Sequence, residues 1–256
     1  MDLSFIIPAH KSEQHLNKCI SSIRKYAIGL SYEIIIVQND GRKLFSMPQQ
    51  DIIMINLHHN KGFGNACNIG AKQAKGDILF FLNPDTELLN NISSSIKQFF
   101  LDKKISIIAP ALITTDGKIQ KWSAGKEINI VSLIKNNLFD WNSKALLEKK
   151  SVLVDWVSGA AFLIKRDIFD KIGGFDENFF MYYEDIDLCL RIRNAGGKII
   201  LLSEIKVLHI GGQSYGEKSK RKKSDYIVSQ DYYFKKHFGK SPALFLRLIR
   251  NIFLND

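Results

Sequence analysis

The first hundred residues alternate between short, continuous apolar runs and segments with helical spacing. We predict strands at the apolar runs, which are residues 3–8 (LSFIIP), 33–37 (EIIIV), 52–57 and 77–82 (DILFFL). We predict helices where apolar positions recur every three or four residues, at 12–26 behind Ser12 as the N-cap, at 65–74 behind a glycine-rich turn, and at 93–100. Continuous apolar strands joined by helices predict a doubly wound α/β sheet.

The second half of the chain has a weaker pattern. We expect a strand at 106–113, a mixture of loop and short helices at 115–150, and strand-like structure at 151–164. After the Gly173-Gly174 turn come a predicted helix at 184–195, a strand at 198–202 and helical structure from Ser224 onward. No internal repeat or low-complexity tract divides the chain, so we expect one α/β domain.

Polar clusters follow the predicted strands at their carboxyl ends. Gln38-Asn39-Asp40-Gly41 comes after the second strand, and Asn83-Pro84-Asp85 comes after the fourth. Because doubly wound sheets bind ligands beyond the carboxyl ends of their strands, we expect a site at this edge. A carboxylate there can share a divalent cation with a substrate diphosphate. Asn-Pro-Asp also suits a simple turn, and these residues alone favour the turn.

Two further groups carry candidate chemistry. Three acids stand at the start of a predicted helix, namely Glu184, Asp185 and Asp187. Negative side chains at this end interact favourably with the helix dipole, and Asp187 can act as a cap. The alternative is that one of them is a general base. His209, followed by two glycines, is either a buried histidine with satisfied hydrogen bonds or a metal ligand. The turn at residues 62–64 matches neither the dinucleotide fingerprint nor the P-loop.

Composition narrows the class of protein. Apolar residues make up 45% of the 256 residues, which is enough for a core, and the formal charge of +10 predicts an anionic partner. Cys19, Cys67 and Cys189 are too far apart for a disulfide framework or a zinc site, so we expect buried thiols in a reducing compartment. No apolar run reaches the ~18 residues of a membrane span, and no signal peptide is present, so we expect a cytoplasmic protein.

Much of the positive charge lies near the end of the chain, at Lys218 and residues 220–223. Residues 243–254 then form an amphipathic segment with Arg247 and Arg250 toward one side and apolar residues on the other, namely Leu244, Phe245, Leu248, Ile252 and Phe253. This pattern indicates either a membrane-surface helix or a helix packed on the body behind a solvated loop. Nucleic-acid binding is a rival, but no nucleic-acid motif is present and no aromatic residues interleave with the basic run.

Taken in order, several segments resemble the inverting family 2 glycosyltransferases of the GT-A fold, in particular bacterial rhamnosyltransferase-type enzymes of O-antigen and cell-wall assembly. The matching segments are SFIIPAHK, EIIIVQND, NKGFGNACNIG, GDILFFLNPDTEL, residues 154–196 and LHIGGQS. The resemblance implies a GT-A domain with a mixed, mostly parallel sheet at 1–214, with a Rossmann-like donor half at about 1–105 and an acceptor half at about 106–214. Residues 215–256 would be a basic loop and an amphipathic helical segment.

The resemblance also implies roles for particular residues. Asp185 would be the catalytic base, and Asp85 with His209 would hold Mg²⁺ or Mn²⁺. Acceptor-side residues would be Trp156, Tyr182 and Glu184, together with Phe180. The nucleotide-sugar pocket would be formed by Pro8, Ala9, Gln38, Asn39, Asn60, Gly62, Asn68, Asn83 and Asp85. Gln38 departs from the family, which usually has Asp at this position, although an amide can still hydrogen-bond a pyrimidine.

The implied reaction transfers a sugar, with rhamnose from dTDP-rhamnose as the first candidate, to a hydroxyl of a lipid-linked or growing polysaccharide, with inversion. The implied partners are a nucleotide-diphosphate sugar, a lipid-linked glycan acceptor and the inner face of the cell membrane, and no nucleic acid. A rival of another class is a non-catalytic relative that binds a nucleotide-sugar and scaffolds glycan assembly. The joint presence of Asp85, Asp185 and His209 favours the enzyme.

Overall fold

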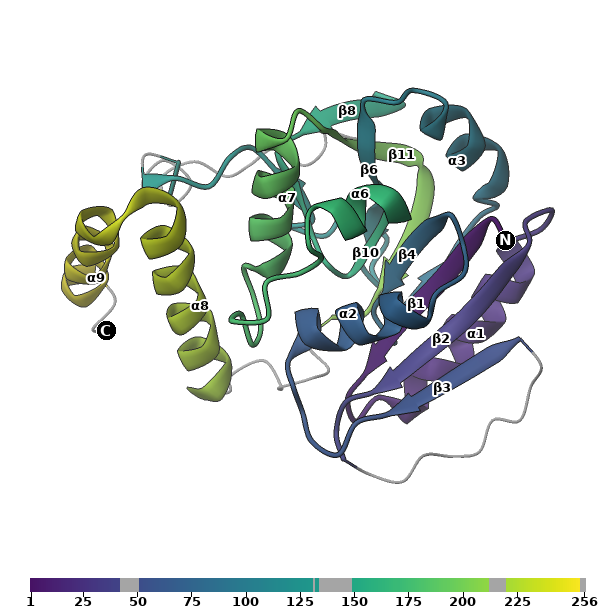
Figure 1. The fold of residues 1–256 in the computed structure, drawn as a ribbon, viewed down its shortest axis with the longest axis horizontal. Helices are drawn as coiled ribbons and strands as arrows, with labels where there is room; N and C mark the ends of the chain where they lie inside the picture. The colour runs from purple at the N-terminus through teal and green to yellow at the C-terminus, as the bar shows by residue number, and fades with distance from the viewer. Residues whose placement is uncertain (42–50, 131, 134–148, 212–219, 254–256) are drawn as a thin grey trace.

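The computed structural model describes residues 1–41, 51–130, 132–133, 149–211 and 220–253 (Figure 1). Its strands are β1 (Leu3–Ala9), β2 (Tyr32–Gln38), β3 (Ile52–Asn56), β4 (Ile78–Leu82), β5 (Thr86–Leu88), β6 (Ile105–Ile113), β7 (Ala124–Gly125), β8 (Ser151–Val154), β9 (Trp156–Val157), β10 (Ala161–Lys165) and β11 (Lys198–His209). Its helices are α1 (Glu13–Tyr26), α2 (Phe63–Gln73), α3 (Ser93–Phe100), α6 (Arg166–Lys171), α7 (Glu184–Asn194), α8 (Lys220–Phe238) and α9 (Lys240–Phe253).

A nine-stranded sheet in the order β3-β2-β1-β4-β10-β6-β11-β5, with β8 paired to β11, forms the centre of the fold. Strands β1, β2, β3 and β4 are parallel, and so are β6 and β11. Strand β10 lies antiparallel between β4 and β6, while β5 and β8 run antiparallel to β11. Strands β1 to β4, β6 and β11 therefore share one direction, which confirms the prediction of a mixed, mostly parallel sheet.

Helices cover both faces of the sheet, as Figure 1 shows. One face packs against α1 and α3 through buried residues such as Leu16, Ile20 and Ile96. The other face packs against α2, α6 and α7, and α8 adds Tyr233 and Phe234 to the same apolar cluster. Both faces of the central strands are thus covered, which explains why their sequences are continuous apolar runs with little alternation.

From β1 to α3, every element except β5 matches the sequence-based prediction within a few residues. Ser12 stands at the N-cap of α1 as expected, but its side chain makes no capping hydrogen bond. The expected strand-like stretch at 151–164 is divided into β8, β9 and β10. The predicted mixture of loop and short helices at 115–150 lies partly outside the described residues, because 134–148 are not described.

The expected strand at 198–202 is only the first part of β11, which continues to His209. Its register against β6 shifts between Leu202 and Lys206, at the polar pair Ser203-Glu204. A pair of polar residues usually leads to the prediction that a strand ends there. In this protein the strand continues past them through a local irregularity in its pairing. The three-residue β5 was not predicted, and its pairing with the last part of β11 has a direct effect on the site described below.

Helix α8 begins at Lys220, four residues before the predicted start, and packs on the body of the protein. Arg247 and Arg250 of α9 bond to Asp231 of α8. Leu244, Phe245 and Leu248 stay exposed. Lys218 and the Gly212-Gln213-Ser214 part of the late motif lie outside the described residues, as do the side chains of Ile252 and Phe253.

All three cysteines are free and buried, which confirms the expected buried thiols. No helix among the described residues is long and apolar enough to cross a bilayer.

Candidate active site

A cavity of about 980 Å³ opens where β1, β2, β4 and β11 end. Most residues that the sequence assigned to a site line this cavity, namely Pro8, Asn39, Asn60, Asn83, Asp85, Trp156, Tyr182, Glu184, Asp185 and His209. Five assigned residues are not among the described residues that line it, and these are Ala9, Gln38, Gly62, Asn68 and Phe180. The structure thus brings the donor-side, metal and acceptor-side candidates to one place.

The residues behind the lining shape the walls of the cavity. Asn68 exchanges two hydrogen bonds of 2.9 Å with the backbone N–H and carbonyl of Phe175. Gly62 adopts φ +89°, and a Cβ at this position would collide with the carbonyl of Phe180. Gln38 is buried, and its amide donates a hydrogen bond within its own turn, to the side chain two residues later. Asn68 thus holds the backbone of Phe175 in place, and Gly62 allows the chain to pass close to Phe180.

The pocket end near β1 and β2 is built from His10, Asn39 and Asn60. The Asn39 amide donates to Asn60 Oδ1 (3.0 Å), and Asn60 Oδ1 also accepts the Gly62 N–H (2.9 Å). His10 Nδ1 lies 3.0 Å from the Asn39 carbonyl and 3.4 Å from Asn60 Nδ2. The two asparagines therefore fix the glycine-rich turn, and His10, which sequence reasoning missed, adds a polar ring to the lining. Its position directly after Pro8-Ala9 was a signal.

Asp85 and His209 meet at the other end of the cavity. They belong to distant segments, and the β5–β11 pairing brings them together, because it sets His209 opposite Thr86. His209 Nε2 lies 3.5 Å from Asp85 Oδ1, and the Gly211 N–H donates to Asp85 Oδ2 (3.1 Å). Burial alone would raise the pKa of Asp85, but the contact with His209 and the Gly211 N–H bring it below the usual value. Asp85 is thus a buried, ionised carboxylate.

These residues have the chemistry to hold a divalent cation. His209 Nδ1 donates to Gln120 Oε1 (2.7 Å), so Nε2 is the ring nitrogen that faces Asp85 and Asn83 and that a cation would use. Gln120 was missed, since nothing in its sequence context marks it. No group of three or more His, Cys, Asp or Glu side chains forms a metal cluster in the described part of the chain. One carboxylate and one imidazole fit a cation that takes its remaining ligands from substrate phosphates.

Glu184 and Asp185 lie at the start of α7 in the cavity wall. Asp185 Oδ2 accepts the Gly159 N–H and Oδ1 accepts the Ile186 N–H, both at 2.8 Å. A Cβ at Gly159 would press on the ring of Phe63 at 3.0 Å, so a glycine fits in the narrow space between this ring and α7. Glu184 is buried, and its Oε2 has no hydrogen-bond partner among the described residues.

The two acids differ in how strongly they hold a proton. Burial raises the pKa of Glu184 well above its usual range, and the charge of Asp185 raises it further. Burial also raises the pKa of Asp185, but the N–H groups of Gly159 and Ile186 stabilise its charged form. We therefore assign the proton of the pair to Glu184 and the negative charge to Asp185.

Strained backbone surrounds the cavity. Four non-glycine residues in the described chain have positive φ, and they are Lys11 (51°), Trp122 (60°), Tyr182 (69°) and Tyr183 (67°). Trp122 and the two tyrosines line the cavity, and Lys11 stands between two lining residues. Such conformations cost about 1–3 kcal/mol each and persist where the surroundings impose them, typically at functional sites.

Trp156 is buried and also lines the cavity. Its indole N–H donates to the Lys126 carbonyl (2.9 Å), and its ring stacks on Trp122 with centroids 6.5 Å apart. Trp122 is 61% exposed and was missed, because it lies in a weakly patterned stretch. Phe180, expected on the acceptor side, is not among the described lining residues.

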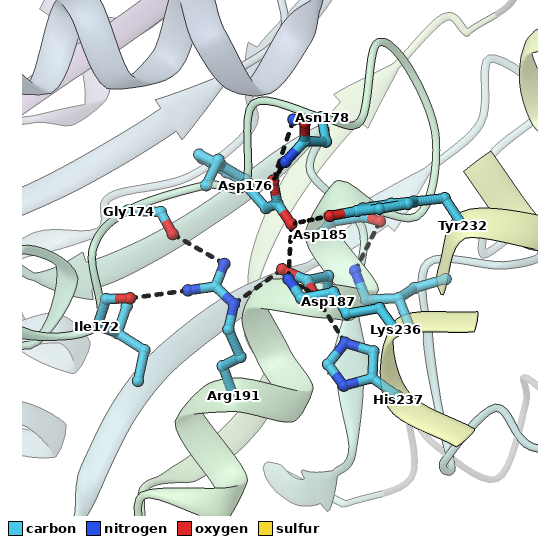
Figure 2. A network of polar contacts seen from close by, with 12 residues as sticks. Ile172, Gly174, Asp176, Asn178, Asp185, Asp187, Arg191, Tyr232, Lys236 and His237 are labelled. Atoms are coloured by element: carbon cyan, nitrogen blue, oxygen red, sulfur yellow. Dashed lines mark hydrogen bonds and ion pairs between the residues drawn. The ribbon is translucent and has the colours of Figure 1, made fainter. Parts of the chain in front are cut away.

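Asp187 does not share the cavity with its two neighbours. It is fully buried, and it accepts hydrogen bonds from Arg191 Nε (2.8 Å), Lys236 Nζ (2.6 Å) and His237 Nε2 (2.7 Å) (Figure 2). Lys236 also bonds to Asp176 at 2.7 Å. The predicted capping role is wrong, because Asp187 instead ties α7 to α8.

The comparisons with known proteins agree with this geometry. The family profile "Glycosyl transferase family 2" matches residues 4–173, and "N-terminal domain of galactosyltransferase" matches 154–211. The chain is 27% identical to Rhamnosyltransferase WbbL of Escherichia coli K12 (80% of this chain, 81% of that protein) and 27% identical to the low-salt glycan biosynthesis hexosyltransferase Agl10 of Haloferax volcanii (98% and 79%).

A shorter match, 38% identical over 90 residues, is N-acetylglucosaminyl-diphospho-decaprenol L-rhamnosyltransferase of Mycobacterium tuberculosis (33% of this chain, 29% of that protein). Among solved structures, GalNAc-T7 with UDP, GalNAc and Mn²⁺ has a TM-score of 0.64 at 16% identity (91% of this chain, 50% of that chain). S. aureus TarS 1-349 with UDP-GlcNAc has a TM-score of 0.58 at 16% identity (91% and 65%). The fold is the GT-A fold, and the chain belongs to glycosyltransferase family 2.

Proposed function

We propose that this glycosyltransferase moves a sugar, rhamnose in the first instance, from a nucleotide-diphosphate donor to a hydroxyl of a lipid-linked or growing glycan, with inversion at the anomeric carbon. The observation that carries the proposal is one cavity that contains both a held, ionised Asp185 and the Asp85–His209 pair. A base and a candidate phosphate-side metal site, facing the same space, are what a single displacement requires.

Asp185 takes the proton of the acceptor hydroxyl while that oxygen attacks the anomeric carbon. The bond from that carbon to the donor diphosphate breaks in the same step, and the nucleoside diphosphate leaves with the bonding electrons. Both carboxylate oxygens of Asp185 already accept a backbone N–H, which fixes the orientation of the group before the substrate binds. The protonated Glu184 beside it adds no second negative charge.

Asp85 and His209 would hold the divalent cation, Mg²⁺ or Mn²⁺. Such an ion supplies charge neutralisation for a departing diphosphate. The protein prepares the pair for this role, since Gln120 fixes the proton on His209 Nδ1 and the Gly211 N–H holds one oxygen of Asp85. His10, Asn39 and Asn60 would face the nucleoside at the opposite end.

The rhamnose donor and the lipid-linked acceptor rest on relatives. Two of the relatives named above are rhamnosyltransferases, and the mycobacterial name specifies a diphosphate-linked lipid acceptor. The solved neighbours carry UDP or UDP-GlcNAc, so uridine donors are the alternative. Gln38, the departure from the family, lies behind the cavity lining and does not decide between the two bases.

Helix α9 supports the proposal of a peripheral position on the membrane. Its arginines turn toward α8 and bind Asp231, which leaves Leu244 (60%), Phe245 (48%) and Leu248 (55%) exposed on one patch. Exposed apolar side chains beside a basic segment are typical of membrane-surface helices. An anionic leaflet would also hold the exposed lysines of α8, which the net charge of +10 favours.

Incubation with dTDP-rhamnose, UDP-GlcNAc and UDP-galactose tests the proposal, with prenyl-diphosphate-linked N-acetylglucosamine as acceptor and Mn²⁺ or EDTA present. We expect a rhamnosylated product only with Mn²⁺, and NMR of its anomeric centre should show the configuration opposite to that of the donor. Transfer from a uridine-diphosphate sugar but not from dTDP-rhamnose would show that the donor is not dTDP-rhamnose. A product in EDTA would refute the metal assignment, and no donor-dependent product or thermal stabilisation would refute the function.

A further inference from the structure

One stripe of helix α8 faces the rest of the protein. Its members recur every three or four residues, so they share a face of the helix, and they are Lys222, Tyr226, Ser229, Gln230, Tyr233, Lys236 and His237. The stripe can be followed from the contacts of its members with the body. At the C-terminal end, Lys236 and His237 bond to the buried Asp187 of α7 at 2.6 and 2.7 Å (Figure 2).

The middle of the stripe holds the strained turn that precedes α7. The Ser229 hydroxyl donates to the Met181 carbonyl (2.7 Å), and the Gln230 amide donates to the Tyr183 hydroxyl (2.8 Å). Tyr226 contacts the Tyr183 hydroxyl at 3.2 Å. These bonds fix the rotation of α8 about its axis, and the same rotation directs its first described turn toward the cavity.

Lys222 and Lys223 occupy that first turn and line the cavity. Neither ammonium forms an ion pair or hydrogen bond with any described residue, although the other polar members of the stripe are bonded to the body. Among the described lining residues they are the only lysines or arginines, and the carboxylates assigned a negative charge there are Asp85 and Asp185. Two amines with no partner among the described residues, held at a cavity wall, form a site for an anion.

Lys222 and Lys223 lie near the acceptor-side residues of the cavity. Tyr226, one turn after them, lies with its ring 5.8 Å from that of Tyr182 and 5.3 Å from that of Tyr183. These tyrosines directly precede Glu184 and Asp185. The Asp85–His209 pair instead belongs to the β5–β11 edge of the sheet. The lysines also lie outside both family profiles, which end at residues 173 and 211.

We propose that Lys222 and Lys223 form an anion subsite that binds a phosphate group of the acceptor, so that the enzyme selects diphosphate-linked acceptors over neutral glycosides. The inference rests on the proposed function for the identity of the substrate, but not for the existence of the anion subsite. A phosphate bound there anchors the acceptor and leaves its sugar hydroxyl free to reach Asp185. Lysine is a flexible point charge and suits a phosphate on a mobile lipid carrier.

The test compares K222A/K223A with the control K235A/K240A. Lys235 and Lys240 are exposed and lie outside the cavity lining, so both double variants lose the same charge. Inorganic pyrophosphate in EDTA is the first probe, read by calorimetry, because without metal it has no reason to bind at Asp85. We expect binding to wild type and to the control variant, and no binding to K222A/K223A. Absence of binding to wild type, or equal binding to all three proteins, overturns the subsite.

Kinetics then distinguish the source of the phosphate. With prenyl-diphosphate-linked N-acetylglucosamine, K222A/K223A should raise the acceptor KM about tenfold, as expected for lost charge-assisted hydrogen bonds. Turnover of octyl N-acetylglucosaminide and the donor KM should stay unchanged. A raised donor KM, or equal losses with both acceptors, would assign the lysines to the donor or to the scaffold and refute the proposal. Loss of turnover in wild type with every donor would instead refute the proposed function.

Discussion

Replacing Asp187 by Asn should destabilise the protein strongly, although the two side chains have almost the same shape. Asp187 is 0% exposed and accepts three hydrogen bonds, from Arg191, Lys236 and His237. Its Oδ1 receives two of them and its Oδ2 the third, so an amide in either orientation would place its NH₂ group against a donor. Breaking a buried ion pair by removing one partner costs about 3–5 kcal/mol, and we expect a loss of this size.

Urea unfolding followed by circular dichroism measures the loss, with Asp51→Asn as the matched control. Asp51 binds Arg24 at 3.0 Å, but the two side chains are 35% and 38% exposed, so solvent screens this pair and a loss of at most about 1 kcal/mol is expected. Both variants replace one paired aspartate by its isosteric amide. An Asp187→Asn loss no greater than that of Asp51→Asn would refute the reasoning, because it would mean that the buried network contributes no more than a surface pair.

The pH dependence gives a second check on the same variant. Burial by itself would raise the pKa of Asp187, but His237, Arg191 and Lys236 hold it below the usual value. The unfolded chain therefore takes up a proton at higher pH than the native protein. The stabilisation is fully present above the unfolded pKa of about 3.9 and is lost as the pH falls through the lower, folded value. The difference between wild type and variant should thus shrink in acid, and a constant difference would contradict the assignment.

Three further predictions concern the cavity. Asp185→Asn should abolish sugar transfer and leave the thermal shift by the donor intact, and retained activity would remove Asp185 from the base role. Asp85→Ala should remove the Mn²⁺-dependent part of that shift, and an unchanged difference between Mn²⁺ and EDTA would contradict the metal site. Glu184→Gln should stabilise the protein more at pH 8 than at pH 5, because the raised pKa of Glu184 makes the wild type lose stability as pH rises above about 4.3. An equal effect at both pH values in urea unfolding would refute that protonation state.

The sheet could be predicted because its information is local. Residues 3–8, 33–37 and 77–82 are apolar at almost every position, since helices cover both faces of the sheet, and each is followed by polar residues at its carboxyl end. Strand direction and the position of the site follow from these two facts. The same rule also selected Gln38, which ends its strand but is not among the lining residues. Sequence shows where a strand ends and not which side chain faces the opening.

Other parts of the site depend on contacts between distant segments. Asp85 and His209 meet through the pairing of β5 with the end of β11, and β5 has only three residues and no pattern of its own. Gln120 and Trp122 come from a stretch with weak periodicity, where hydrogen bonding and stacking determine their place. Such pairings are set by the packing of the whole sheet, so a pattern within ten residues cannot reveal them.

The three acids of α7 show how one local motif divides into two functions. Residues two apart on an α-helix point about 200° from each other, so Asp185 and Asp187 face opposite sides. Asp185 therefore lines the cavity, whereas Asp187 is paired with Arg191 and Lys236 and adds little negative potential to the cavity. In the sequence the three acids look alike. In the structure, however, the last of them, Asp187, anchors helix α8, and α8 brings Lys222 and Lys223 to the same cavity. Removing that anchor should consequently weaken acceptor binding as well as stability, although Asp187 does not line the cavity.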